Sequence, residues 1–277
     1  FIYIEAKKLL PVQFNFPNVS VTGTENLMMA SVFVEGKTTL KNCAKEPEVE
    51  DLANFLNSCG AKIEGAGSSI ITIEGVHTLK KTHWEVLFDR IEAGTYLVAG
   101  AITKGKVKIN KIIPEKLKCL IISLEKMGFT IFCSENSIEI DARTATIKCQ
   151  DFSTDPYPGF PTDMQAQLMA LNCIGEGSAL ITEQVFENRF QHVKELRKMG
   201  ANITLEKNSA VIKGVPNLVG SEVTASDLRA SASLVLAGLI GKNRTKINEI
   251  HHIDRGYECI EEKLNKLGAE IIREPLP

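Results

Sequence analysis

Aspartate and arginine residues recur in this sequence just ahead of, or close to, stretches predicted to be helices. A carboxylate can act as a general base, and a guanidinium group binds carboxylates and phosphates through paired hydrogen bonds. An arginine at a helix N-terminus is electrostatically unfavourable, because that end already carries partial positive charge. Several such arginines near converging helix starts are explained if an anion binds among them. The residues concerned are Asp89, Asp163, Asp227, Arg90, Arg189, Arg229 and Arg255.

The same residues also have structural interpretations. Aspartate is a favoured helix N-cap, which accounts for Asp89 without any function, and the arginines could form surface ion pairs with their acidic neighbours. Two other motifs favour no site. The segment VEGKTTL resembles the end of a phosphate-binding loop, but Ser31 replaces its first glycine. His251, His252 and Asp254 suggest a metal, yet adjacent histidines on an extended segment point to opposite sides.

The elements that must position these residues repeat four times, at a period of roughly 70 residues. In each copy an apolar helix rich in small residues leads into a strand and then an amphipathic helix that ends at a glycine. Two more strands close the unit, except that the fourth copy is expected to lack its final strand. The repeated unit is therefore β-α-β-α-β-β. The apolar helices are expected at 26–34, 91–103, 164–174 and 228–240, the amphipathic helices at 49–59, 116–127, 191–199 and 257–267, and their terminating glycines are Gly60, Gly128, Gly200 and Gly268.

The apolar helices carry almost no charge, which predicts that they are buried on all sides. We expect residues 88–277 to form a domain in which three of these helices cluster at the centre with sheets outside. Residues 1–87 form a single unit, interpreted as the last unit of a first domain that is otherwise missing, because one unit cannot bury its apolar helix alone. The sequence opens on Phe1 inside an expected strand (FIYIEA), so we expect a longer parent polypeptide.

Composition excludes several classes of protein. The chain has 277 residues, of which 44% are hydrophobic, and this is enough for two domains with cores. A net charge of -2 argues against a general nucleic-acid surface. No apolar run approaches the roughly 18 residues of a membrane helix, and no secretory signal precedes the first repeat, so a cytoplasmic location is expected. The seven scattered cysteines are expected to be reduced thiols.

Several segments closely resemble the MurA family of UDP-N-acetylglucosamine enolpyruvyl transferases, and the resemblance extends over essentially the whole chain. It implies the fold of that family, an inside-out α/β barrel built of the same β-α-β-α-β-β units. The segments are 19–30 (VSVTGTENLMMA), 44–56 (AKEPEVEDLANFL), 160–167 (FPTDMQAQ), 185–190 (VFENRF), 226–238 (SDLRASASLVLAG) and 251–258 (HHIDRGYE).

The resemblance implies transfer of the enolpyruvyl group of phosphoenolpyruvate to the 3-hydroxyl of UDP-N-acetylglucosamine, with release of phosphate, as the first committed step of peptidoglycan synthesis. No metal or cofactor is implied. Asp163 matches the base that takes the sugar proton, and Asp227 is implied to assist proton movement. Arg189 and Arg255 match the groups that hold the donor's carboxylate and phosphate, and Arg229 lines the same site.

The resemblance also assigns the sugar nucleotide to particular residues. Val185 matches a backbone contact to it. Many relatives carry lysine where this chain has Asn18, so one diphosphate contact differs. The stretch that grips the diphosphate and uracil matches Asn18, Val19, Ser20 and Val21.

Other parts of the family's site are expected upstream of Phe1, on missing N-terminal units of the same polypeptide. These are a Lys-Asn pair and a mobile loop that carries the acid, a cysteine or an aspartate. None of the seven cysteines here matches that loop, so the chain alone is expected to turn over poorly or not at all. The open alternatives are a non-catalytic sugar-nucleotide-binding fragment or pseudoenzyme, and the sister enzyme 5-enolpyruvylshikimate-3-phosphate synthase. RNA-processing cyclases share the repeat architecture, but no basic stripe with interleaved aromatics supports nucleic acid.

Overall fold

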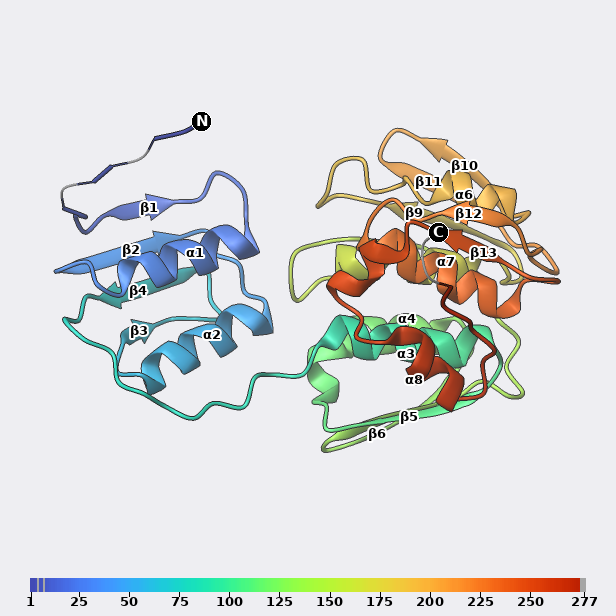
Figure 1. The fold of residues 1–277 in the computed structure, drawn as a ribbon, viewed down its shortest axis with the longest axis horizontal. Coiled ribbons are helices and arrows are strands. Elements are labelled where there is room, and N and C mark those ends of the chain that lie inside the picture. Colours follow the sequence, from blue (N-terminus) through green and yellow to red (C-terminus); the bar gives the residue numbers. More distant parts are fainter. Residues whose placement is uncertain (4, 7, 275–277) are drawn as a thin grey trace. The chain divides into compact units, whose positions relative to one another are not determined.

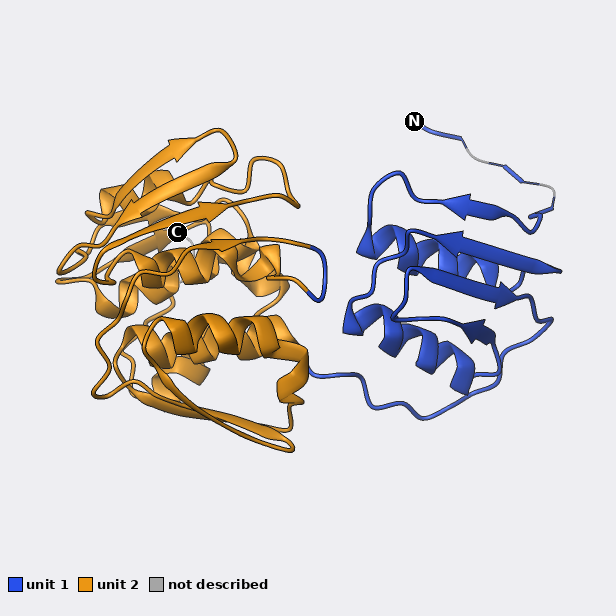
Figure 2. Cartoon of the chain, turned by 180° about the vertical axis from the view of Figure 1, so that it is seen from behind, with its two compact units in different colours: residues 1–88, 156–158 blue, residues 89–155, 159–277 orange. Residues whose placement is uncertain are grey.

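The computed structural model describes residues 1–3, 5–6 and 8–274. The chain divides into two compact units (Figure 2). Unit 1 comprises residues 1–88 together with 156–158, and unit 2 comprises residues 89–155 and 159–277. None of the helices in the described part of the chain is long and apolar enough to cross a membrane.

Unit 1 is one complete β-α-β-α-β-β unit, as the repeat predicts. Two helices pack on a four-stranded sheet of order β1-β2-β4-β3, in which β1 and β2 are parallel and the other pairs antiparallel (Figure 1). The core includes Met28 of the first helix and Ile71 and Ile73 of the last strand. The elements are β1 (Gln13–Asn15), α1 (Val21–Ser31), β2 (Lys37–Lys41), α2 (Pro47–Ser58), β3 (Lys62–Glu64) and β4 (Ile70–Glu74).

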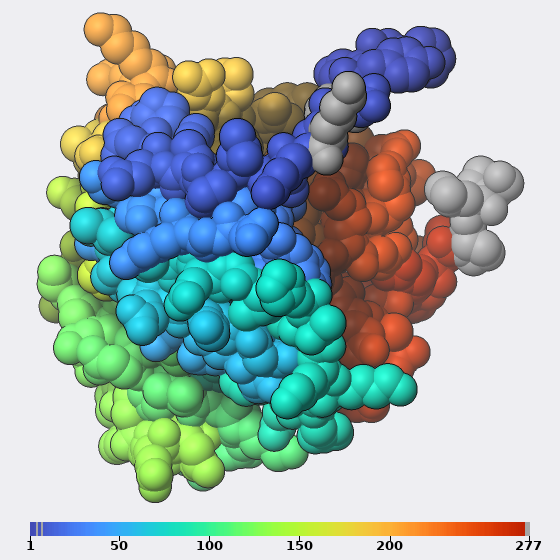
Figure 3. All heavy atoms as spheres, turned by 90° about the vertical axis from the view of Figure 1, so that its left-hand side faces the viewer, coloured from blue at the N-terminus to red at the C-terminus, as the bar shows by residue number. Residues whose placement is uncertain are grey.

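The start of unit 1 differs from the sequence-based expectation in two ways. Helix α1 begins at Val21 rather than at residue 26, because the Ser20 hydroxyl caps it and accepts a hydrogen bond from the Gly23 amide at 3.1 Å. The strand expected at the chain's start is also wrong. Residues 1–3 and 5–6 form no strand, and residues 1–3 project from unit 1 with exposed side chains (Figure 3). Ile4 of that segment lies outside the described residues.

Unit 2 contains the other three copies of the repeat. The second copy has α3 (Arg90–Ile102), β5 (Lys106–Asn110), the 3-10 helix η1 (Pro114–Leu117), α4 (Lys118–Lys126), β6 (Thr130–Ser134) and β7 (Ser137–Asp141). The third has β8 (Phe152–Ser153), η2 (Thr162–Met164), α5 (Gln165–Asn172), β9 (Ser178–Thr182), α6 (Val193–Lys198), β10 (Asn202–Glu206) and β11 (Ser209–Lys213). The fourth has β12 (Glu222–Thr224), α7 (Leu228–Ile240), β13 (Lys246–Asn248), η3 (Ile250–Arg255) and α8 (Ile260–Lys266).

The predicted arrangement of helices inside and sheets outside is confirmed in unit 2. Helices α3, α5 and α7 pack against one another at its centre. Three separate sheets surround them, of order β5-β7-β6, β10-β11-β9-β8 and β12-β13, and the described strands form no closed barrel. Every residue of α5 is buried, which explains why its sequence carries no charge on any face.

The turns that the repeat predicts are also present. Gly60, Gly128, Gly200 and Gly268 follow the second helix of each copy with φ of 102°, 99°, 89° and 103°. A residue with a side chain rarely adopts this conformation, and glycine does so without steric cost.

The two motifs set aside in the sequence have ordinary structural roles. VEGKTTL turns from α1 into β2 through Gly36, which has a φ of 107°. The extended segment expected for His251 and His252 is wrong. Both residues belong to η3, where the centroids of their rings lie 4.1 Å apart. Asp254 pairs with Arg273 at 2.7 Å.

Candidate active site in unit 2

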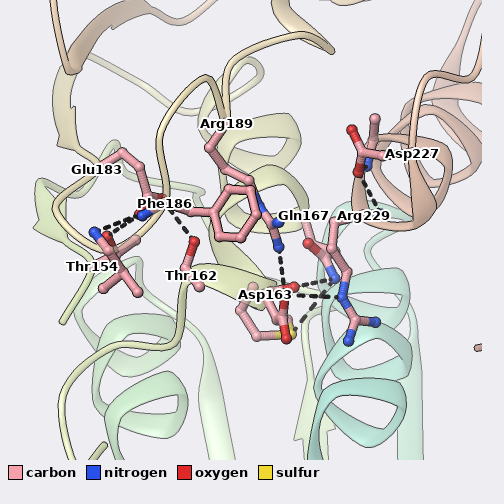
Figure 4. Close-up of polar contacts among 12 residues, drawn as sticks. Thr154, Thr162, Asp163, Gln167, Glu183, Phe186, Arg189, Asp227 and Arg229 are labelled. Carbon is pink, nitrogen blue, oxygen red and sulfur yellow. Dashed lines mark hydrogen bonds and ion pairs between the residues drawn. The ribbon is translucent and has the colours of Figure 1, made fainter. Parts of the chain in front are cut away.

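The centre of the candidate site is an ion-pair cluster of Asp163, Arg189 and Arg229 (Figure 4). One carboxylate oxygen of Asp163 accepts a hydrogen bond from Arg189 Nη2 and lies 3.3 Å from Arg229 Nε. Three segments distant in sequence supply the residues: η2, the loop between β9 and α6, and the first turn of α7. The N-cap interpretation is wrong for Asp163, because residue 161 holds the cap position of η2 and no side chain caps this helix.

This cluster carries net positive charge, since two guanidinium groups share one carboxylate. Burial raises the pKa of Asp163, but Arg229 and Arg189 together outweigh it and hold the pKa below its ordinary value. The Asp163 side chain is 41% exposed, against 13% for Arg189 and 14% for Arg229. Arg189 Nε is buried and has no hydrogen-bond partner among the described residues. The cluster therefore offers an accessible, ionised carboxylate beside an unused cationic donor, which suits an anionic ligand.

The loop that carries Arg189 is supported on both sides. The guanidinium carbon of Arg189 lies 5.0 Å from the centroid of the Phe186 ring, which is a cation–π contact. His192, in the same loop, is buried, and its Nε2 lies 3.2 Å from Met169 Sδ of helix α5. The loop is thus attached to helix α5 beneath it through His192.

The buried His192 predicts that acid destabilises unit 2. Burial lowers the pKa of His192 from 6.5 to about 4, so as the pH falls the unfolded chain takes up the proton first. Its contribution to stability is complete above pH 6.5 and is lost as the pH falls to about 4, an effect of about 3 kcal/mol. Urea unfolding at a series of pH values should show this loss. In His192→Gln the fall between those pH values should be smaller, and an equal fall would contradict the assignment.

A buried polar layer holds Arg229 and Asp163 from the side of the helices. Arg229 Nη1 donates to the Tyr257 hydroxyl at 3.3 Å, and that hydroxyl lies 2.9 Å from Thr95 Oγ1. Gln167 Nε2 donates to Thr95 Oγ1 at 3.1 Å, to the Tyr257 hydroxyl at 3.3 Å and to the Asp163 carbonyl at 2.9 Å. Sequence reasoning missed Thr95, Gln167 and Tyr257. The signal was present, because a hydroxyl and an amide stand within otherwise apolar helices.

Removing the Tyr257 hydroxyl should destabilise unit 2. Tyr257→Phe keeps the ring but removes the hydroxyl to which Thr95, Gln167 and Arg229 hydrogen-bond. Leaving such buried groups without a partner lowers the free energy of unfolding by about 1–3 kcal/mol. The matched control is Tyr96→Phe, because the Tyr96 hydroxyl is buried without a partner among the described residues. Chemical denaturation of both variants is the measurement. Equal stability of the two variants would show that the polar layer contributes nothing.

The remaining aspartates and arginines have separate roles in the structure. Asp89 caps α3 and accepts from the amides of Ile91 and Glu92 at 2.7 and 3.0 Å, so its N-cap interpretation is confirmed. Asp227 caps α7, and its Oδ1 accepts hydrogen bonds from the amides of Arg229 and Ala230 at 2.9 and 3.0 Å.

Two of the arginines lie outside the cluster. Arg90 is the first residue of α3, whereas Arg255 is the last residue of η3, and its expected place at a helix start is wrong. Arg255 is exposed and forms no ion pair with a described residue. The structure therefore brings only Arg189 and Arg229 of the predicted arginines to Asp163.

The residues matched to sugar-nucleotide binding fall in both units. Asn18 to Val21 belong to unit 1, where Ser20 is the cap of α1 and Val19 is 39% exposed. Val185 belongs to unit 2 and is 42% exposed. Its amide donates to Glu183 Oε1 at 2.9 Å, whereas its carbonyl accepts no hydrogen bond from a described residue. A backbone contact from Val185 to a ligand would therefore use the carbonyl.

Comparison with known proteins places this geometry in a family. The model of the EPSP synthase family (3-phosphoshikimate 1-carboxyvinyltransferase) matches residues 2–264. The chain belongs to this family. Family membership accounts for the repeated units and for the central helices with sheets around them.

Curated relatives and solved structures agree with this assignment. UDP-N-acetylglucosamine 1-carboxyvinyltransferases of Hydrogenovibrio crunogenus and Coxiella burnetii are 51% and 53% identical over 99% and 96% of the chain. The chain spans 65% and 61% of their lengths, less than two thirds. The enolpyruvyl transferase NikO from Streptomyces tendae matches with a TM-score of 0.84 and 26% identity over 96% of this chain and 66% of its own. EPSP synthase from Acinetobacter baumannii, at 21% identity and a TM-score of 0.72 over 95% of this chain and 63% of its own, shows the shared fold.

Proposed function

We propose that this protein transfers the enolpyruvyl group of phosphoenolpyruvate to the 3-hydroxyl of UDP-N-acetylglucosamine and releases phosphate. Support comes from the names of relatives at 51–53% identity and from the cluster at Asp163. The observation that carries the proposal is an ionised carboxylate held between two arginines, at the residues that the family resemblance assigns to base and anion binding. The reaction belongs to peptidoglycan synthesis, and we place the protein in the cytoplasm, in cell-wall biogenesis and so in cell shape and division.

In this proposal each group of the cluster has a chemical task. Asp163 accepts the proton of the sugar hydroxyl as that oxygen attacks the donor. Arg189, with its unused buried donor, binds the carboxylate or phosphate of phosphoenolpyruvate, and Arg229 supports it. Arg255 approaches the same anion from η3 when the substrate is bound. Asn18 to Val21 and the Val185 carbonyl bind the sugar nucleotide. Asp227 acts through Arg229, whose backbone amide donates a hydrogen bond to the Asp227 carboxylate.

The proposal predicts which ligands bind and how fast phosphate appears. Saturation-transfer NMR on the purified chain should detect binding of UDP-N-acetylglucosamine and should detect no binding of shikimate-3-phosphate. Phosphorus NMR should show slow phosphate release or none from the chain alone, because no proton donor has been assigned to it.

The outcomes separate the alternatives. Binding of shikimate-3-phosphate without the sugar nucleotide would favour the sister enzyme, and absence of both would overturn the proposal. Rapid release by the chain alone would contradict the expected lack of an acid. A sugar nucleotide that binds without turnover under any condition would favour a non-catalytic binding protein.

A further inference from the structure

Glu183 is a buried carboxylate, 5% exposed, that joins three segments of unit 2 (Figure 4). Its Oε1 accepts hydrogen bonds from Thr154 Oγ1 at 2.7 Å and from the amides of Val185 and Phe186, each at 2.9 Å. Its Oε2 accepts from Thr162 Oγ1 at 3.0 Å. These four donors are uncharged, so Glu183 acts as a set of acceptors rather than as half of an ion pair.

Two of these bonds lead directly to the site cluster. Thr162 immediately precedes Asp163 in η2, and Phe186 carries the ring on which the Arg189 guanidinium lies. Without Glu183 the amides of Val185 and Phe186 would lack their acceptor, and η2 would lose the hydrogen bond that the Thr162 hydroxyl donates.

The backbone of Glu183 is fixed independently of these segments. Its amide donates to the Asn208 carbonyl at 2.8 Å, and Asn208 Nδ2 donates to the Glu183 carbonyl at 3.2 Å. Asn208 belongs to the turn between β10 and β11, so Glu183 is anchored to the sheet. The carboxylate is therefore a fixed point from which both halves of the Asp163–Arg189 pair are held.

We propose that Glu183 is a positioning residue, which sets the approach of the Arg189 guanidinium to the Asp163 carboxylate through its bonds to Phe186 and Thr162. The consequence for substrate binding rests on the function proposed above, whereas the consequence for the ion pair does not. This role requires acceptors of the right shape and does not require the negative charge.

Two substitutions separate shape from charge. Glu183→Gln keeps one oxygen for the Thr154 hydroxyl and the two amides, and its NH2 group can donate to the Thr162 hydroxyl, which then reverses its role. Glu183→Leu keeps similar volume but removes every acceptor. Positioning predicts that the glutamine variant resembles the wild type and that the leucine variant does not. A third variant, Thr162→Val, cuts only the bond to η2.

The control is Glu195→Leu. Glu195 is also buried, 2% exposed, and accepts the Thr224 amide at 3.0 Å and Lys198 Nζ at 2.8 Å. The substitution Glu195→Leu should lower the stability of unit 2 in the same way as Glu183→Leu, but it should leave the cluster of Asp163, Arg189 and Arg229 unaffected.

The test measures the pKa of Asp163 by carbon NMR of the carboxyl group, assigned with Asp163→Asn. Arg189 helps to hold that pKa below its ordinary value, so a loosened pair should let it rise. We expect a rise in Glu183→Leu, a smaller rise in Thr162→Val, and no change in Glu183→Gln or Glu195→Leu. An unchanged pKa in Glu183→Leu overturns the proposal, as does an equal rise in Glu195→Leu. A rise in Glu183→Gln that matches leucine would show that charge, not position, is what matters.

A second measurement carries the inference to function. Misplacing a group by about 1 Å can slow a reaction on the order of 100-fold, and we expect phosphoenolpyruvate to bind at least about tenfold more weakly to Glu183→Leu than to Glu183→Gln. If the proposed function fails, the wild type will not bind phosphoenolpyruvate, yet the pattern of Asp163 pKa values will persist. If only the positioning role fails, the wild type will bind the donor, and the pKa of Asp163 in Glu183→Leu will either stay unchanged or rise no more than it does in Glu195→Leu.

Discussion

Asp163→Asn is expected to slow enolpyruvyl transfer by about 100-fold to 10,000-fold, the usual contribution of a general base. Asparagine keeps an oxygen for the two arginines but cannot accept the sugar proton at neutral pH. It also removes the negative charge that competes with the substrate for Arg189 and Arg229. The KM for phosphoenolpyruvate should therefore stay constant or fall while kcat collapses. Steady-state kinetics on any preparation that releases phosphate measures both.

The control for this substitution is Asp141→Asn. Asp141 forms a comparable pair with Arg143, 2.6 Å apart, next to the end of β7. Losing that pair should leave transfer unchanged. If Asp163→Asn keeps more than a tenth of the rate, Asp163 is not the base. If instead KM rises with kcat unchanged, the carboxylate serves only to hold the arginines in place.

Arg189→Met is expected to weaken phosphoenolpyruvate binding by about 10-fold to 100-fold, which corresponds to the loss of a charged hydrogen bond of about 1.5–3 kcal/mol. Methionine retains the apolar stem over the Phe186 ring but has no donor. The same change removes one of the two cations beside Asp163, so the pKa of that carboxyl should rise. Calorimetric titration of phosphoenolpyruvate and carbon NMR of Asp163 measure the two effects.

Arg244→Met supplies the comparison, because Arg244 is exposed and lies in the connection from α7 to β13. It removes the same charge from unit 2 without touching the cluster. If both variants bind the donor equally well, the contribution of Arg189 is long-range electrostatics and not a direct contact. A lysine at position 189 should rescue only part of the affinity, since it lacks the paired donors of arginine.

The sequence predicted the helices well where one physical signal dominated. Apolar stretches with few charges, each preceded by an aspartate cap and followed closely by a glycine, indicated α3 and α7 to within a residue at each end. The start of α1 was missed because its first turn, TGTEN, is polar, and only the Ser20 hydroxyl marks it as a helix start. The first residue of such a helix depends on a single capping hydrogen bond, which the periodicity of hydrophobic residues does not reveal.

The site was predicted in part, for a similar reason. A common face for the helix starts correctly grouped Asp163 with Arg229, and the Arg189 loop reaches the same point. Arg255 was grouped with them by sequence position, but it is the exposed last residue of a 3-10 helix and forms no ion pair with Asp163. Glu183 and Gln167 were overlooked because their importance comes from partners far along the chain, on η2 and α3.

The polar layer between the central helices has a consequence for how unit 2 avoids misassembly. Its three copies are similar, so helices α3, α5 and α7 could exchange places or slide along one another while still burying apolar surface. Only the native alignment brings Thr95, Gln167 and Tyr257 into mutual hydrogen-bond distance. Any exchanged or shifted packing would strand these groups in an apolar interior, at about 1–3 kcal/mol each. The layer thus favours the native order of three similar repeats, and Arg229 of the site lies at its edge, where it donates to the Tyr257 hydroxyl.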